Sequence, residues 1–166
     1  MSPHNANPDP TQATNPITRR WFAFVRVIDR SGTSTAITGV FSERGVSFGS
    51  LSTLDVHDGL GTMSVEFRAS ERLAHVLVRT VERLAVVKTV TLVHAEDPCV
   101  RALGVVATGS RESVTVAQPD VTVWSEGAGA TATTVLSGPL VEVERAVEAL
   151  RDAGATSVAM TVLPPR

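Results

Sequence analysis

The order in which strand-like and helix-like patterns follow one another in residues 20–94 constrains the fold of this chain most. Residues 62–68 alternate strictly between apolar and polar side chains, the pattern of a strand with one buried face. Residues 21–28 are almost continuously apolar and predict a central strand. Two more strands are expected over residues 46–57 and 87–94.

Two helices with a single apolar stripe lie between these strands. The first is expected over residues 35–44 and ends at Gly45, a residue type that readily takes the left-handed conformation found after helices. The second follows Ser70, a favourable N-cap. Asp58 and Gly59 predict the hairpin turn between the second and third strands. The predicted order is β-α-β-β-α-β, a ferredoxin-like α+β unit. The stripe of the second helix comprises Leu73, Leu77, Val81 and Leu84.

The rest of the chain repeats this pattern less completely. A helix is expected to have Pro139 in its first turn and to end at Gly154. Residues 109–120 lie where the first helix of the repeat belongs, but they show no helical stripe. The second unit is therefore expected to be a degenerate ferredoxin-like unit that lacks its first helix. Its strands are expected over residues 101–107, 121–125, 130–136 and 156–163, and its helical stripe comprises Leu140, Val143, Val147 and Leu150.

Composition excludes several classes of partner. Residues 1–18 contain four prolines among polar residues and predict a disordered arm. The net charge of −2, without clusters of basic residues, does not favour nucleic-acid binding. No apolar run approaches the roughly 20 residues of a membrane span, and no signal peptide is apparent. We expect a cytoplasmic protein with a first domain over residues 19–96 and a second over residues 97–166.

The residues that could carry catalysis or bind a metal are scattered. His57, His75 and His94 lack the short spacing of a zinc site, and the single cysteine, Cys99, excludes an internal disulfide. No Gly-x-Ser-x-Gly nucleophile motif is present. We therefore expect no catalytic residue, no metal and no cofactor.

A series of short phrases resembles the ACT domain of the acetolactate synthase small subunit. The first three are the turn at residues 29–32, the phrase Phe-Ser-Glu-Arg-Gly at 41–45, and the segment that ends at Ser50 and Leu51. Residues 61–65, 83–87 and 101–103 continue the resemblance in the same order, so that it covers residues 21 to about 163.

This resemblance implies a non-catalytic regulatory subunit of branched-chain amino acid biosynthesis. Its ACT domains would pair as a homodimer or higher homo-oligomer, with a small amino-acid-like effector between two chains. The partner would be a thiamine-diphosphate-dependent catalytic subunit, which would hold the thiamine, magnesium and flavin. Unpaired amides at a helix N-terminus suit the effector's carboxylate. The implied effector-binding residues are Asp29, Arg30, Ser31, Gly32, Thr33, Ser34, Ser47 and Phe48.

Three positions depart from the family pattern. Asp29 and Ser47 each stand where the family has asparagine, and Ser34 stands where it has leucine. An ionised aspartate accepts hydrogen bonds and donates none, so Asp29 would repel a carboxylate but could pair with an ammonium group. The identity of the effector therefore stays open. Two alternatives also remain: an ACT-fold scaffold that has lost its ligand, and a cofactor-free ferredoxin-like enzyme.

Overall fold

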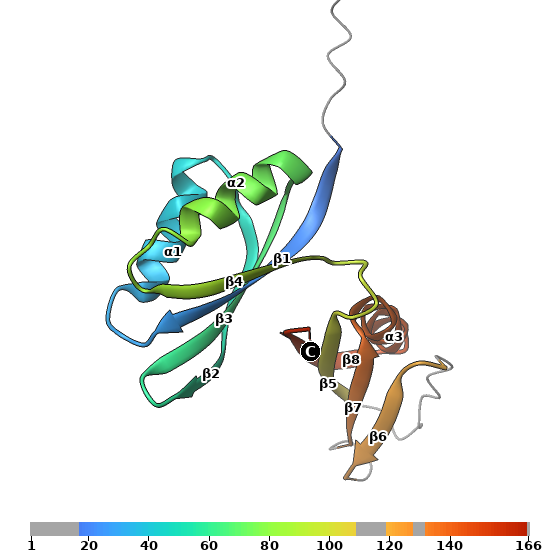
Figure 1. Ribbon diagram of the computed structural model, residues 1–166. Helices are drawn as coiled ribbons and strands as arrows, with labels where there is room; N and C mark the ends of the chain where they lie inside the picture. The colour runs from blue at the N-terminus through green and yellow to red at the C-terminus, as the bar shows by residue number, and fades with distance from the viewer. Residues whose placement is uncertain (1–16, 109–118, 128–131, 166) are drawn as a thin grey trace, which may run out of the picture.

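The computed structural model describes residues 17–108, 119–127 and 132–165 of the 166-residue chain. Within them the chain forms two units, each with a four-stranded antiparallel sheet that carries helix on one face (Figure 1). The first unit consists of β1 (Thr18–Ile28), α1 (Thr33–Glu43), β2 (Phe48–His57), β3 (Leu60–Ser70), α2 (Glu71–Val81) and β4 (Val87–His94).

The second unit repeats the topology of the first. The strand order is β2-β3-β1-β4 in the first sheet and β6-β7-β5-β8 in the second, so β5 takes the place of β1 and α3 the place of α2. This confirms the predicted ferredoxin-like α+β fold and the internal repeat. The second unit consists of β5 (Arg101–Thr108), β6 (Thr122–Glu126), β7 (Thr133–Pro139), α3 (Leu140–Asp152) and β8 (Ala155–Leu163).

The predicted helix signals are confirmed in the first unit. The backbone amides of Gly45 and Val46 donate to the carbonyls of Ser42 and Phe41, and Gly45 has a φ of 66°. This is the Schellman arrangement that ends α1. The Ser70 side chain accepts a hydrogen bond from the Leu73 amide and caps α2.

Several predicted boundaries differ from those observed. β1 begins at Thr18, within the expected arm, because β3 extends to Ser70 and offers Thr18 a pairing partner. α2 ends at Val81, so Leu84 lies beyond the helix, where it still packs against the core. Pro139 precedes α3 as its N-cap, since α3 begins at Leu140.

Other predictions fall outside the described residues. They include the arm over residues 1–16 and most of the segment expected to lack a helix, residues 109–118. The division of the chain at residues 96 and 97 stays a prediction. No helix in the part of the chain that the structure describes is long and apolar enough to cross a membrane.

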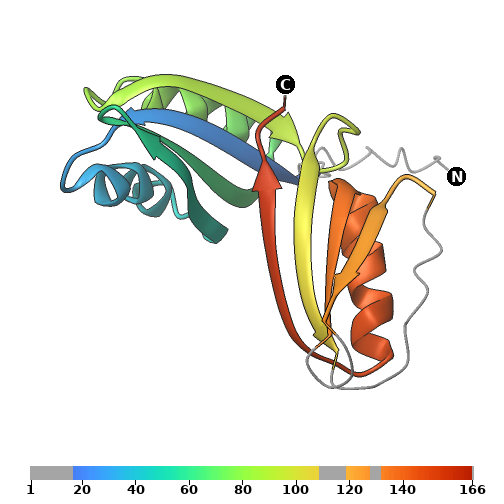
Figure 2. The same ribbon diagram turned by 90° about the horizontal axis from the view of Figure 1, so that it is seen from below.

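The central strand β1 is buried on both faces. Its odd-numbered side chains from Trp21 to Val27 pack under α1 and α2 in one core. Phe22 and Phe24 point to the opposite face and join the core of the second unit. Figure 2 shows the two sheets meeting at an angle, with the second unit below the first sheet. The expected single buried face is therefore wrong for this sheet, because the second unit covers part of the face without helices, around Phe22 and Phe24.

Candidate functional site

The turn between β1 and α1 is held by backbone hydrogen bonds at both of its ends. The Asp29 amide donates to the Gly59 carbonyl at the hairpin tip, over 2.9 Å, and the Thr33 amide donates to the Arg30 carbonyl, over 3.2 Å. Gly32 precedes the helix with a φ of 85°, a left-handed conformation that favours glycine. The predicted turn therefore exists and has a defined backbone shape.

The side chains of this turn differ in their roles. Thr33 is buried, and its hydroxyl donates to the Ile28 carbonyl over 3.1 Å, so it holds the helix to the end of β1. The first turn of α1 contains no acidic residue. Helix geometry leaves the amides of Ser34 and Thr35 without a carbonyl inside the helix. These amides can receive a carboxylate, and the exposed predicted residues around them are Asp29, Arg30, Ser31 and Ser34.

Ser47 and Phe48 lie at a different place, where α1 has ended and β2 begins. They border a hollow of about 540 Å³ that is open to solvent. Phe48 is 39% exposed although it is a large apolar side chain. The hollow is also lined by Arg44, Gly49, Glu66, Phe67, Arg68 and Ser70.

A single chain does not bring the two halves of the predicted site together. Phe48 pairs with Phe67, which in turn pairs with Trp21 near the start of β1. The Asp29–Gly32 turn follows Ile28, at the other end of that strand. Seven residues of strand separate these ends, which is about 24 Å at the usual rise per residue. A small ligand bound to a single chain therefore cannot touch both halves.

An ionic cluster that was not predicted from the sequence lies beside the hollow. The Arg20 Nε donates to Glu66 Oε1 over 2.7 Å, and its Nη1 donates to Glu144 Oε1 of α3 over 2.6 Å. Burial disfavours the charged guanidinium, but the hydrogen bonds and charges of the two carboxylates outweigh it and raise the pKa of Arg20. The β3 alternation correctly placed Glu66 on the polar face, but its partners come from distant segments.

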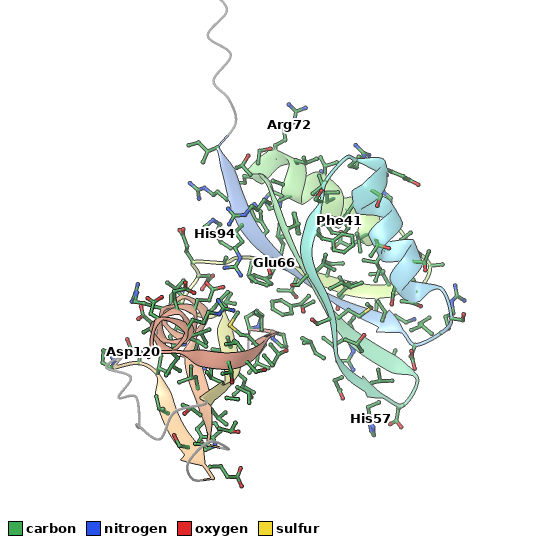
Figure 3. All side chains as sticks on the ribbon, turned by 180° about the vertical axis from the view of Figure 1, so that it is seen from behind. Phe41, His57, Glu66, Arg72, His94 and Asp120 are labelled. Carbon is green, nitrogen blue, oxygen red and sulfur yellow. The ribbon has the colours of Figure 1, made fainter. Side chains whose placement is uncertain are left out.

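The histidines form no metal site within the described residues. No group of three or more histidine, cysteine or acidic side chains gathers there in a way that could hold a metal. His57 is at the exposed hairpin tip beside Asp58 (Figure 3). His94 packs edge-on against Trp21, with ring centroids 5.1 Å apart, and its Nδ1 accepts a hydrogen bond from the Glu96 amide.

Comparisons with known proteins identify the fold. No protein-family model matches the chain, and no curated protein matches it. The acetolactate synthase small subunit of Thermotoga maritima superposes with a TM-score of 0.69 at 15% identity, covering 89% of this chain and 98% of that one. The aspartate kinase regulatory subunit of Thermus thermophilus superposes with a TM-score of 0.46 at 15% identity. That match covers 82% of this chain and 93% of the Thermus thermophilus chain. The chain thus has the ACT-type fold, arranged over nearly its whole length as in the Thermotoga maritima small subunit.

Proposed function

We propose that this chain is a non-catalytic regulatory protein that binds an amino-acid-like effector between two copies of its first unit. The observation that carries the proposal is the separation of the two halves of the candidate site. The amides at the start of α1 and the hollow beside Ser47 and Phe48 lie at opposite ends of the first sheet. One half offers unpaired backbone amides and the other an open hollow, and two copies would bring these halves together.

The β2 edge supports the way in which the copies would pair. β2 is an outer strand of the first sheet, and unpaired strand edges readily accept another strand. It exposes one large apolar side chain near each end, Phe48 at 39% and Val56 at 50%. Both share the helix-bearing face, since they pair with Phe67 and Gly61 of β3. An antiparallel pairing about a two-fold axis near Ser52 would place Phe48 of one copy opposite Val56 of the other.

This pairing would also join the two halves of the site. It moves Ser47 and Phe48 of one copy to the hairpin end of β2 in the other copy. At that end the Gly59 carbonyl holds the Asp29 amide, so the start of α1 lies close by. Binding would then depend on assembly, and ligand occupancy would favour the paired state.

We further propose that the regulated partner is an acetolactate-synthase-type enzyme. The support is the whole-chain likeness to the Thermotoga maritima small subunit, which includes the second unit. The test is the rate of a purified catalytic subunit with and without this chain, at several amino acid concentrations. A rate that never depends on the chain or on an amino acid would contradict this partner.

A thermal-shift screen against the twenty amino acids and common 2-oxo acids tests the effector. Free ligand at 100 times its dissociation constant should stabilise the protein by about 2.7 kcal/mol. Gly32→Ala should abolish the response, because it strains the backbone that presents the α1 amides. Gly154→Ala is the matched control, since Gly154 also has a positive φ and open space around it but follows α3. An equal ligand-dependent thermal shift in the two variants would contradict the assigned site.

The second candidate is an ACT-fold scaffold that regulates by contact alone. Two observations favour it: Asp29 would repel a carboxylate, and the hydroxyl of Thr33 is already used inside the fold. A flat ligand screen together with intact self-association would support the scaffold over the sensor.

A further inference from the structure

The cluster around Arg20 connects the two units through a continuous set of hydrogen bonds. Arg20 uses different nitrogens for its two carboxylates, so it can hold Glu66 of β3 and Glu144 of α3 at the same time. Only 22% of the Arg20 and Glu66 side chains and 31% of the Glu144 side chain are exposed. Partly buried, charge-assisted hydrogen bonds are stronger than exposed ion pairs.

The same cluster reaches the edge strand β2. The second oxygen of Glu66, Oε2, accepts a hydrogen bond from the Ser50 hydroxyl over 3.1 Å. Gly49 makes room for this carboxylate, because a Cβ at that position would lie 3.2 Å from Glu66 Cδ and Oε1. Gly49 and Glu66 both line the hollow that contains Ser47 and Phe48. Figure 3 shows Glu66 on the side of the sheet that faces the second unit.

The guanidinium of Arg20 also contacts an aromatic ring. It lies over the ring of Phe22, 5.2 Å from the centroid, and Phe22 belongs to the core of the second unit. An arginine side chain stays charged in a protein. A change in the charge or position of Glu66 would therefore act on a fixed cation that also holds α3.

We propose that Ser50, Glu66, Arg20 and Glu144 form a relay that couples the β2 edge of the first unit to α3 of the second. A partner strand or an effector ammonium at the edge would compete with Ser50 and Arg20 for the Glu66 carboxylate. Arg20 would then hold Glu144 differently, and α3 would respond. The part that concerns the effector and the paired edge rests on the proposed function; the coupling between edge and helix does not.

A double-mutant cycle without ligand tests the coupling. Ser50→Ala removes the edge contact and Glu144→Ala removes the helix contact, and no hydrogen bond joins these two side chains directly. If Ser50 orients Glu66 for Arg20, the effect of Ser50→Ala should shrink once Glu144 is gone. We expect the double variant to depart from additivity by about threefold or more in the unfolding equilibrium constant, which exceeds the departure seen between independent sites. Additive or more-than-additive effects would overturn the relay.

The control cycle replaces Glu144→Ala with Glu148→Ala. Glu148 is also on α3 and also bonds an arginine, Arg151 three residues later, but its side chain is exposed and outside the cluster. This cycle should be additive. Non-additivity of equal size with Glu148 would assign the coupling to α3 in general and would also overturn the relay.

Hydrogen exchange across a dilution series then tests the functional part. If copies pair at β2, dilution should raise amide exchange in β2 and also in α3 of the unaltered chain. In Glu144→Ala the β2 response should persist and the α3 response should be lost. An α3 response that survives in Glu144→Ala overturns the relay. A chain in which dilution changes neither element contradicts the proposed pairing, while the ligand-free cycle still decides the relay.

Discussion

Phe22 and Phe24 stack with ring centroids 6.3 Å apart on the face of the first sheet that carries no helix. Phe22 is 1% exposed and Phe24 is 4% exposed, and both belong to the core of the second unit. The two units therefore share a hydrophobic core through β1, in addition to the Arg20 cluster.

Replacing Phe24 tests how much this shared core stabilises the chain. Phe24→Ala should lower the free energy of unfolding by about 3–5 kcal/mol, the usual effect of truncating a buried phenylalanine. Urea denaturation followed by circular dichroism measures the change. Trp124→Ala is the control, because Trp124 of β6 is a large side chain that is 47% exposed, and its truncation should cost far less. Similar losses for the two variants would show that Phe24 is not part of a shared core.

The apolar pattern of β1 shows which part of the packing between the two units could be predicted from the sequence. Its continuous apolar run correctly predicts a central strand, since such a strand is buried on both faces. The alternation in β3 predicts a polar outer face, yet Ser64 on that face is only 3% exposed. Ser64 pairs with Phe24, so the second unit covers both. The alternation of side chains along a strand predicts which residues share a face. It does not predict whether another part of the chain buries the polar face, because that depends on tertiary packing.

Two glycines provide opposite tests of the packing. A Cβ on Gly138 of β7 would lie 2.8 Å from the Asp120 carbonyl oxygen, so Gly138→Ala should destabilise the fold by about 1–3 kcal/mol. A Cβ on Gly39 inside α1 would meet nothing within 4 Å, so Gly39→Ala should stabilise it by about 1 kcal/mol. Thermal melts of both variants measure the difference. A neutral Gly138→Ala would mean that the start of β6 can move aside freely.

The N-cap of α2 gives a smaller, local effect. Ser70→Ala removes the acceptor of the Leu73 amide and should cost about 1 kcal/mol. Ser42→Ala is the matched control, because Ser42 is an exposed serine in the last turn of α1. Chemical denaturation compares the two. A larger loss for Ser42→Ala would be inconsistent with capping by Ser70.

The candidate site was predicted less completely than the fold. Gly45 has the positive φ that its place after the first helix predicts. Gly32 also has a positive φ, which was not predicted from the sequence. The Arg20–Glu144 bond joins residues 124 positions apart, and no local spacing predicts it. The Asp29 turn is separated from Phe48 because β1 and β2 run parallel, so α1 returns the chain to the starting end of β1.

Self-association through β2 gives the sharpest test of the proposed site. The proposed two-fold axis places Phe48 of one copy opposite Val56 of the other, so Phe48→Lys should shift the chain toward monomer in multi-angle light scattering. Adding Val56→Glu should restore the larger species, because lysine then faces glutamate across the pair. Val123→Lys, on the outer strand β6 of the second unit, is the control and should leave the mass unchanged. Dissociation by Val123→Lys but not by Phe48→Lys would move the interface to the second sheet. In that case the two halves of the candidate site would stay apart.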